Sequence, residues 1–562
     1  MRTYSSPTQI SIPVNLSLTQ LLYTTTTPPL PPSHLTHSDS LTHRSLTLHE
    51  LRTNAGRIAN GLSKTFDPRD QSRWAIILPN SCDYVEIVHS ILWVGGVVCP
   101  INHAIVASEI AHGFTVTRPE YIVAYGPVVP KIEEAVQIAE KQMTEQNISW
   151  RAPTIITIVE RAQARGYKHV PDDFVLSKEI LSVPQYEDTT QRLATINLSS
   201  GTTGKPKGVE LTHYNYVSNV KQLEAHDAKQ FHRGSRIVAF TPFAHIGNTT
   251  FPLFFGPYMG ILHHAMPQFS LETFAHLVDS LKPTIFQGAP SVVLAFANTD
   301  ITHRYDFSHA EKIDCGGPPF KKDMYDRLMS KAPWRINQVY GMTEAAGYVA
   351  YQHSADVQPD NVVGRLLPNL EVALRVDGGK ADAPVGGPGE MWIRGPNITR
   401  GYAFNPEANA SAFPAEGWYN TGDVCTISPK GIVAVVGRTK ELIKYKGFQV
   451  SPAELETYLN SHPDVVEGGV GAVFDESQLT ELPTGYVVLK EGVGGEKERV
   501  EALRRIQGDV DGKVSGYKKL RGGVWEVERV PRNATGKVVR AELKGERTGL
   551  SSLERRDRRA KL

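Results

Sequence analysis

Cysteine is scarce in this sequence of 562 residues: the chain has only Cys82, Cys99, Cys315 and Cys425, and none of them forms a Cys-x-x-Cys pair. Four cysteines are far too few for a disulfide scaffold of this length, which indicates a reducing compartment. The absence of paired cysteines also argues against a structural zinc site. We therefore expect neither disulfides nor zinc to hold the fold together.

An excess of charge of one sign is also missing. The chain has 60 Lys+Arg against 59 Asp+Glu, a formal net charge of +1, which creates no general field for nucleic acid or an anionic membrane. The longest apolar stretch, residues 87–101, is interrupted by polar residues and glycines and is too short for a transmembrane helix. The N-terminus lacks the basic and then apolar pattern of a secretory signal. We therefore expect no nucleic-acid partner and no transmembrane segment.

What the sequence does have is the ordinary composition of a globular protein, with 40% hydrophobic and 21% charged residues. Residues 1–45 are rich in Ser, Thr and Pro, which predicts a loosely ordered arm. Beyond them, helical spacing alternates with short apolar runs, which predicts an α/β domain with layered, mostly parallel sheets. After about Gly364, short β-type runs lie between Gly/Pro turns and predict a β-rich subdomain.

The predicted organisation is therefore an arm over 1–45, a large N-terminal domain over 46–437, and a small, mobile α+β domain over 438–562. The last domain is predicted from a new helix and strand pattern that begins after the Val436-Gly437-Arg438 break.

The strongest local signal is a glycine-rich loop after the strand-like residues 193–198. Its candidate ligand-binding residues are Ser199, Ser200, Gly201, Thr202, Thr203, Gly204 and Lys207. Glycines let the backbone approach a ligand closely, and the hydroxyl and N–H groups can donate to phosphate oxygens. Taken alone, such a cluster is more often a flexible polar turn. The spacing is not that of a Walker A loop, which argues against a P-loop NTPase.

With Leu211-Thr212-His213 behind it, this loop resembles the signature loop of the adenylate-forming superfamily. That superfamily includes acyl-CoA and aryl-CoA synthetases, 4-coumarate-CoA ligase-like enzymes and luciferases. Four further segments match in the same order: 315–319, 338–344, 418–423 and 437–450, and a fifth match follows at 531–538. The resemblance covers about residues 45–539, nearly the whole chain.

The resemblance implies an ATP and AMP site in the large domain. It implies nucleotide contacts from Gly316, Gly317, Pro318, Gln338, Tyr340, Gly341, Met342, Thr343, Asp423 and Arg438. Within this set, Tyr340 offers a flat face to adenine and Asp423 matches the carboxylate that accepts from the ribose hydroxyls. Glu344 matches the Mg²⁺ ligand, and Mg²⁺ is a cation that takes few protein carboxylates besides substrate phosphates.

Further catalytic roles follow from the same resemblance. It implies that Lys537 bridges the acid and the α-phosphate, that Lys440 is the hinge, and that Lys444, Lys446 and Gly447 face the thiol acceptor. His245 matches an aromatic or His gate of the acyl pocket, although a lone His beside apolar residues is more often core. The bulky Phe251, Leu253, Phe254, Phe255 and Tyr258 are mostly expected in the core, with some available to line that pocket. Gln268 stands where many relatives have Lys, which puts one CoA contact in doubt.

The implied reaction uses ATP, Mg²⁺ and coenzyme A to convert a carboxylic acid, through an acyl-AMP, into a thioester. The expected acid is apolar, medium-chain or aryl. Only residues 538–562 follow Lys537, too few for a carrier domain, so free CoA is the expected acceptor. Loading of a separate carrier protein and luciferase-like oxidation of the adenylate remain alternatives. A non-enzymatic nucleotide-binding protein is disfavoured because Glu344, Asp423 and Lys537 are all present.

The C-terminal Ala560-Lys561-Leu562 is similar to the Ser-Lys-Leu peroxisomal address. The alternative is a random basic tail, because several arginines precede it. We expect recognition by the peroxisomal import receptor, and a cytoplasmic location otherwise.

Overall fold

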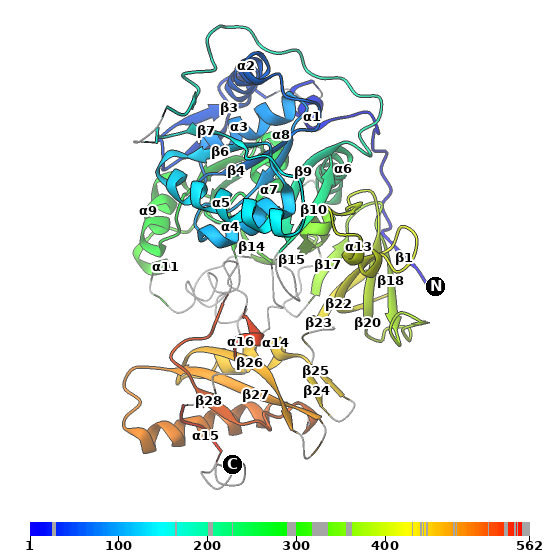
Figure 1. Cartoon of the computed structure of the whole chain (residues 1–562). Coiled ribbons are helices and arrows are strands. Elements are labelled where there is room, and N and C mark those ends of the chain that lie inside the picture. Colours follow the sequence, from blue (N-terminus) through cyan, green and yellow to red (C-terminus); the bar gives the residue numbers. More distant parts are fainter. Residues whose placement is uncertain are drawn as a thin grey trace.

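The computed structural model consists of a large body and a smaller C-terminal unit that follows it after residue 438 (Figure 1). The structure describes residues 1–24, 30–162, 166–199, 206–227, 229–288, 299, 301–316, 335–355, 362–429, 431–438, 441, 443–445, 448–475, 478, 480–514, 516–532, 538–543, 547 and 549–553.

The first sheet of the large body has eight strands in the order β21-β10-β9-β5-β4-β6-β7-β8. Their bounds are β4 (Arg73–Ile77), β5 (Val97–Pro100), β6 (Tyr121–Tyr125), β7 (Thr154–Ile158), β8 (His169–Val170), β9 (Leu193–Ser199), β10 (Lys207–Thr212) and β21 (Gly401–Tyr402). Strands β4 to β8 are parallel, because α3 (Cys82–Trp93), α4 (Ala107–Thr117) and α5 (Val129–Glu145) provide the crossovers. Only β10 and β21 are added in the antiparallel sense.

The second sheet has fifteen strands, in the order β1-β18-β20-β22-β23-β17-β16-β15-β14-β13-β11-β12-β2-β3, with β19 beside β18. Its parallel part comprises β2 (Leu35–Asp39), β12 (Leu262–Ala265), β11 (Arg236–Ala239), β13 (Ile285–Gly288), β14 (Lys312–Gly316) and β15 (Arg335–Met342). Helices α2 (Leu48–Phe66), α6 (His213–His226), α7 (Ile246–Thr250), α8 (Gly256–Met259), α9 (Leu271–Leu281) and α11 (Ile301–Arg304) and the π-helix η2 (Phe251–Phe255) complete this part of the body.

Beyond β15 the same sheet becomes antiparallel. This part contains β16 (Gly347–Tyr351), β17 (Val362–Leu366), β18 (Glu371–Val376), β19 (Ala381–Asp382), β20 (Gly389–Arg394), β22 (Tyr419–Ile427) and β23 (Ile432–Arg438). Helix α13 (Pro406–Ala412) lies between β21 and β22 in the chain. The predicted fold class, mostly parallel layers followed by a β-rich part, is confirmed.

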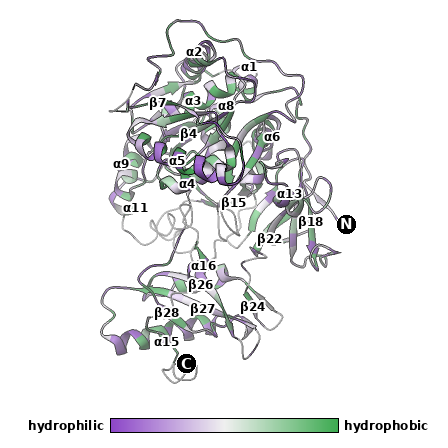
Figure 2. Ribbon diagram, viewed as in Figure 1, coloured by the Kyte–Doolittle hydropathy of each residue, from purple (hydrophilic) through white to green (hydrophobic). Residues whose placement is uncertain are grey.

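The smaller unit has a hydrophobic core of its own, which includes Val450, Leu455, Val487 and Leu503. Its three-stranded sheet is made of β26 (Val465–Asp475), β27 (Thr480–Leu489) and β28 (Val524–Glu526). The other elements are β24 (Ile443–Tyr445), β25 (Phe448–Val450), α14 (Pro452–Asn460), α15 (Glu496–Gly512) and α16 (Arg540–Leu543). Figure 2 shows α15 as a largely hydrophilic helix beside the greener β27, as expected of a surface helix that buries one stripe.

The N-terminal segment differs from the expected loose arm. β1 (Tyr4–Ser5) pairs with β18, and α1 (Leu18–Thr24) buries Leu18, Leu21 and Leu22 completely. Ser17 and Gln20 cap this helix reciprocally, since each side chain accepts from the other residue's backbone N–H at 3.2 and 2.9 Å. For residues 1–24 and 30–45 the expectation is wrong, because the Ser/Thr-rich composition hides a short apolar helix and two strands, β2 and β3 (Ser45–Thr47).

No helix among the described residues is both long enough and apolar enough to cross a bilayer.

The packing of α1 leads to a stability prediction. Leu21→Ala should lower the free energy of unfolding of the large body by about 2–5 kcal/mol, because it empties a fully buried site. Val14→Ala is the matched control, since Val14 is 49% exposed and should change little. Urea unfolding followed by tryptophan fluorescence measures both. Equal midpoints for the two variants would mean that α1 is not part of the core.

Candidate active site

The two ends of the glycine-rich loop are held by an antiparallel strand pair. Ser199 ends β9 and lies opposite Lys207, which begins β10. Ser199 is buried and the Nζ atom of Lys207 lies 4.8 Å from the ring centroid of Tyr402. The pairing therefore holds the two ends of the loop, Ser199 and Lys207, side by side.

Asp423 joins three of the predicted motifs. The pairing of β22 with β23 places Asp423 opposite Arg438, whose Nε donates to Asp423 Oδ1 at 2.9 Å. Tyr340, on β15, donates its hydroxyl to Asp423 Oδ2 at 2.6 Å. Burial raises the pKa of Tyr340 well above its ordinary value, and the negative charge of Asp423 adds to this. The carboxylate thus has a protein donor on each oxygen, one of them the charge-assisted contact with Arg438.

Glu344 lies in a 3₁₀ turn, η3 (Thr343–Ala345), directly after β15. Its carboxylate is buried, and Oε1 accepts from the hydroxyl of Tyr402 at 3.0 Å. Burial raises the pKa of Glu344, although hydrogen bonds from its own backbone N–H and from Tyr402 and the charges of Arg438 and Lys207 oppose the shift. The hydroxyl of Tyr402 also lies 3.1 Å from that of Tyr419.

These contacts fit a Mg²⁺ site of the kind the sequence predicts. Glu344 supplies one carboxylate in a well-defined orientation, and Oε2 accepts no hydrogen bond from any other residue that the structure describes. Magnesium bound to a nucleotide takes few carboxylates, since phosphate oxygens and water complete its shell. Among the described residues there is no cluster of three or more acidic, His or Cys side chains that could hold a metal by itself.

The backbone at the end of β15 explains a glycine in the motif. A Cβ at Gly341 would lie 1.8 Å from the carbonyl oxygen of Gly347 on β16, because the two strands approach closely at a bulge after Tyr340. No other residue fits there without moving the strand. Gln338 is buried on the same strand, Met342 and Thr343 are half-buried, and Gly316 ends the neighbouring β14 beside Val339.

His245 is exposed rather than packed in the core. It precedes α7, and its carbonyl accepts from the N–H of Asn248 and of Thr249 at 2.9 and 2.8 Å. The bulky residues after it behave differently: Phe251, Leu253, Phe254 and Phe255 are buried in the main core, and Tyr258 is half-buried. The core interpretation therefore holds for these four residues and not for His245.

The structure thus brings Lys207, Tyr340, Glu344, Asp423 and Arg438 together. Sequence reasoning missed Tyr402 and the hydroxyl of Tyr419. Tyr402 lies outside every motif that was recognised, and Tyr419 lies inside one without carrying an assigned role. Several predicted residues lie outside the described part of the chain: Ser200, Gly201, Thr202, Thr203, Gly204, Gly317, Pro318, Lys440, Lys446, Gly447, Lys537 and the side chain of Lys444.

Two protein-family models match this chain. The model of the "AMP-binding enzyme" family matches residues 32–403, and that of the "AMP-binding enzyme C-terminal domain" matches residues 454–537. The chain belongs to the AMP-binding enzyme family. The N-terminal match contains the glycine-rich loop, Glu344 and Tyr402, and the second match ends at Lys537.

Individual relatives of this AMP-binding enzyme align over most of their length. The chain is 28% identical to "Probable 4-coumarate--CoA ligase 3" of Dictyostelium discoideum over 525 residues, which cover 90% of this chain and 91% of that protein. It is also 28% identical to 4-coumarate–CoA ligase 2 of Solanum tuberosum over 513 residues, 90% of each protein.

Solved structures share the fold. The anthranilate CoA ligase AuaEII in complex with anthranoyl-AMP has a TM-score of 0.82 at 22% identity and covers 95% of this chain and 97% of that one. ATP-bound MatB from Rhodopseudomonas palustris has a TM-score of 0.80 at 24% identity and covers 94% and 99%.

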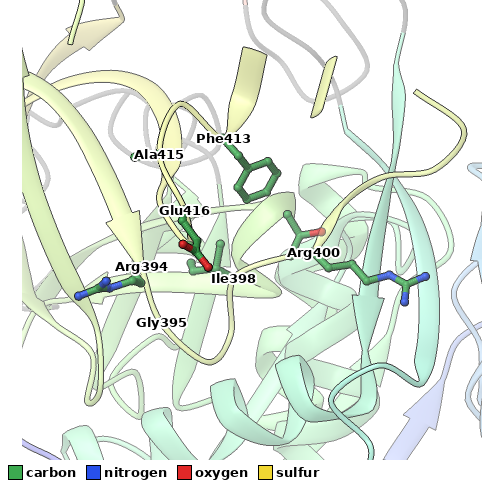
Figure 3. Close-up of a pocket in the computed structure, with 9 residues that line it drawn as sticks. Arg394, Gly395, Ile398, Arg400, Phe413, Ala415 and Glu416 are labelled. Carbon is green, nitrogen blue, oxygen red and sulfur yellow. The ribbon is translucent and has the colours of Figure 1, made fainter. Parts of the chain in front are cut away.

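A hollow of about 520 Å³ is lined by none of the predicted site residues. It is lined by Arg394, Gly395, Ile398, Thr399, Arg400, Phe413, Ala415, Glu416 and Gly417 (Figure 3). Figure 3 shows Arg394 and Arg400 extending in opposite directions, and they pair with Glu371 and Glu210. The hollow adjoins the site because Thr399 N donates to the carbonyl oxygen of Glu344 at 2.7 Å.

An ion-pair cluster in the smaller unit connects the residues next to Lys537 with those next to Lys440. Arg540, three residues after Lys537, donates at 2.9 Å to Glu441, next to the predicted hinge, and at 2.9 Å to Glu456 of α14. Burial raises the pKa of Glu456, and the charge of Arg540 opposes the shift. On the N-terminal side of Lys537, Arg532 forms an ion pair with Glu467, and its backbone forms an isolated β-bridge with Val538.

This cluster leads to the second prediction. Arg540→Leu should leave Glu456 without its counter-charge and lower the free energy of unfolding of the smaller unit by about 3 kcal/mol. Amide hydrogen exchange in β26 and β27 measures it, as an approximately 100-fold loss of protection. Arg505→Leu removes an exposed ion pair with Asp464 and should leave exchange unchanged. Equal exchange in both variants would contradict a supporting role for Arg540.

Proposed function

We propose that the protein is an AMP-forming acid–thiol ligase that activates a carboxylic acid with ATP and transfers the acyl group to coenzyme A. The observation that carries this proposal is the convergence of Lys207, Glu344, Tyr340, Asp423 and Arg438, from four separate motifs, on one partly buried polar site, where the charges of Arg438 and Lys207 both act on Glu344. The CoA-ligase names of the aligned relatives support the same chemistry.

The first half of the reaction makes the acid a usable acyl donor. A carboxylate oxygen attacks the α-phosphorus of ATP, the bond from that phosphorus to the bridging oxygen breaks, and pyrophosphate leaves, so that acyl-AMP forms. Lys207 is suited to hold phosphate charge at the end of the loop, and the Asp423 carboxylate to bind the ribose hydroxyls. Glu344 would hold Mg²⁺, which neutralises the phosphate oxygens when bound. Lys537 would stabilise charge that develops between acid and phosphate.

The second half transfers the acyl group. The thiol of CoA loses its proton, its sulfur attacks the acyl carbonyl, and AMP leaves with the electrons of the anhydride bond. For this step we propose Lys440 as the hinge. We place Lys444, Lys446 and Gly447 near the thiol. A rotation of the smaller unit between the two half-reactions would exchange Lys537 for these residues.

The acid is proposed to be apolar, medium-chain aliphatic or aryl. Support for this comes from the 4-coumarate–CoA ligases among the relatives. Phe251, Leu253, Phe254 and Phe255 lie in the main core, whereas Tyr258 is half-buried and His245 is exposed at the start of α7, so we propose the last two as the pocket candidates of this set.

The deciding experiment incubates the purified chain with ATP, Mg²⁺, CoA and a panel of aliphatic and aryl acids. A ligase forms AMP, pyrophosphate and an acyl-CoA thioester in equal amounts. Acyl-AMP that accumulates without thioester would favour a carrier-loading enzyme, and light or oxidised product would favour a luciferase-like reaction. Absence of acid-dependent pyrophosphate–ATP exchange with every acid would reject adenylation.

A third prediction separates the half-reactions. Lys537→Ala should reduce acid-dependent pyrophosphate release by about 100- to 1,000-fold, because one charged donor to the transition state is lost. Thioester formation from supplied acyl-AMP should stay near the parental rate. Lys497→Ala, on the exposed face of α15, is the control and should change neither rate. Unchanged pyrophosphate release in Lys537→Ala would refute the assigned role.

We also propose peroxisomal import through Ala560-Lys561-Leu562, which lie outside the described residues. A fluorescent protein fused in front of the chain should appear in punctate peroxisomes, and removal of the last three residues should disperse it. A dispersed signal from the intact fusion would contradict the proposal.

A further inference from the structure

Tyr402 occupies the point where the glycine-rich loop and the Glu344 motif meet. Its hydroxyl lies 3.0 Å from Glu344 Oε1 and 3.1 Å from the hydroxyl of Tyr419. The Nζ atom of Lys207 lies over its ring, 4.8 Å from the centroid. One aromatic side chain thus contacts the predicted phosphate-binding lysine with its face and the predicted metal ligand with its edge.

The number of protons on each group determines which group donates in this hydrogen-bond network. An ionised carboxylate only accepts, so the hydroxyl of Tyr402 must donate its single proton to Glu344. The oxygen of Tyr402 then accepts from Tyr419, because neither hydroxyl has a second proton to give. The chain Tyr419, Tyr402, Glu344 therefore points both O–H groups toward the carboxylate, and donors in series strengthen one another.

The position of Tyr402 is fixed independently of Glu344. Asn409 binds its backbone on both sides, with Oδ1 accepting from its N–H at 2.6 Å and Nδ2 donating to its carbonyl at 3.0 Å. The residue also pairs with Val209 of β10, two residues after Lys207, and the next residue, Ala403, donates to the carbonyl of Gly208 at 2.8 Å. The backbone of Tyr402 is therefore fixed relative to β10, the strand that follows the glycine-rich loop.

Glu344 by contrast needs orientation. Its backbone carbonyl is held by Thr399, but its side chain follows a short turn. Besides the backbone N–H of Glu344 itself, Tyr402 is the described residue that donates to the carboxylate, at Oε1. With Oε1 engaged, Oε2 is the oxygen left for a cation bound to nucleotide phosphates. A carboxylate free to rotate would lose entropy on binding that cation, and a pre-oriented one avoids this loss.

We infer that Tyr402 is a positioning residue that orients the Glu344 carboxylate for the magnesium–nucleotide complex, with Tyr419 as its supporting donor. This inference rests on the proposed function, since it assumes that Glu344 meets the cation. Tyr402 acts through Glu344 and through its ring beneath Lys207, so it need not contact the substrate itself.

The test uses the full chain and α,β-methylene-ATP, which cannot be converted to an adenylate, with no acid present. Isothermal titration gives the affinity for this nucleotide with and without Mg²⁺, and the ratio of the two is the gain due to the cation. Tyr402→Phe should reduce this gain by about 10- to 100-fold, as expected when a hydrogen-bond partner of a metal ligand is lost. Tyr419→Phe should reduce it only about twofold.

The controls separate positioning from damage to the fold. Tyr84→Phe removes a buried hydroxyl for which the described residues offer no hydrogen-bond partner, and should leave the gain unchanged. Affinity without Mg²⁺ should stay within about twofold of the parent in Tyr402→Phe, because the phenyl ring still packs under Lys207. In a Glu344→Gln background, adding Tyr402→Phe should change nothing further, since the group through which it acts is gone.

Two results would overturn the inference. One is that Mg²⁺ raises the nucleotide affinity of Tyr402→Phe as much as that of Tyr84→Phe. The other is that Tyr402→Phe reduces the effect of Mg²⁺ on nucleotide affinity equally in the Glu344→Gln background. Failure of the proposed function looks different: the parent protein would then bind no nucleotide analogue under either condition. Raising Mg²⁺ should also restore the adenylation rate of Tyr402→Phe, a recovery that a misfolded site would not show.

Discussion

The burial of two carboxylates in one region of the large body constrains everything around the site. Glu344 is 8% and Asp423 is 4% exposed, and a buried charge is tolerated only where hydrogen bonds replace the water it has lost. Asp423 obtains its donors from Arg438 and Tyr340, and Glu344 from Tyr402. The strands that carry these donors must therefore stay in register, whatever else changes in the protein.

These donors connect the two sheets. Tyr340, Asp423 and Arg438 belong to the fifteen-stranded sheet, whereas Tyr402 and Lys207 belong to the eight-stranded sheet. The contact between Tyr402 and Glu344 thus joins sheet to sheet at the site itself. In the proposed function the phosphates would meet Lys207 of one sheet and the ribose would meet Asp423 of the other, which accords with the tendency of ligands to bind where strand ends of α/β layers meet.

Much of this could be predicted from local patterns. Helical spacing over residues 271–281 and short β-type runs over 371–376 and 389–394 are visible in the sequence, and these ranges are the bounds of α9, β18 and β20. These segments are strongly periodic and end at Gly, Pro or capping residues, so neighbouring residues alone define them. Helix α1 was missed because its apolar residues follow a long Ser/Thr/Pro-rich stretch, although Ser17-Leu-Thr-Gln20 carries a capping-box pattern.

The sequence by itself determined the family and the alternation of helices and strands, because both depend on residue types at fixed local spacing. Only the tertiary structure decided that Asp423 faces Arg438 and Tyr340, that His245 is exposed while Phe254 is core, and that Tyr402 joins Glu344 to Lys207. Tyr402 and Glu344 are 58 positions apart; Tyr402 lies in the eight-stranded sheet, and Glu344 lies in the turn that follows β15 of the other sheet. Their contact results from strand pairing and packing between distant segments, which no local pattern in the chain encodes.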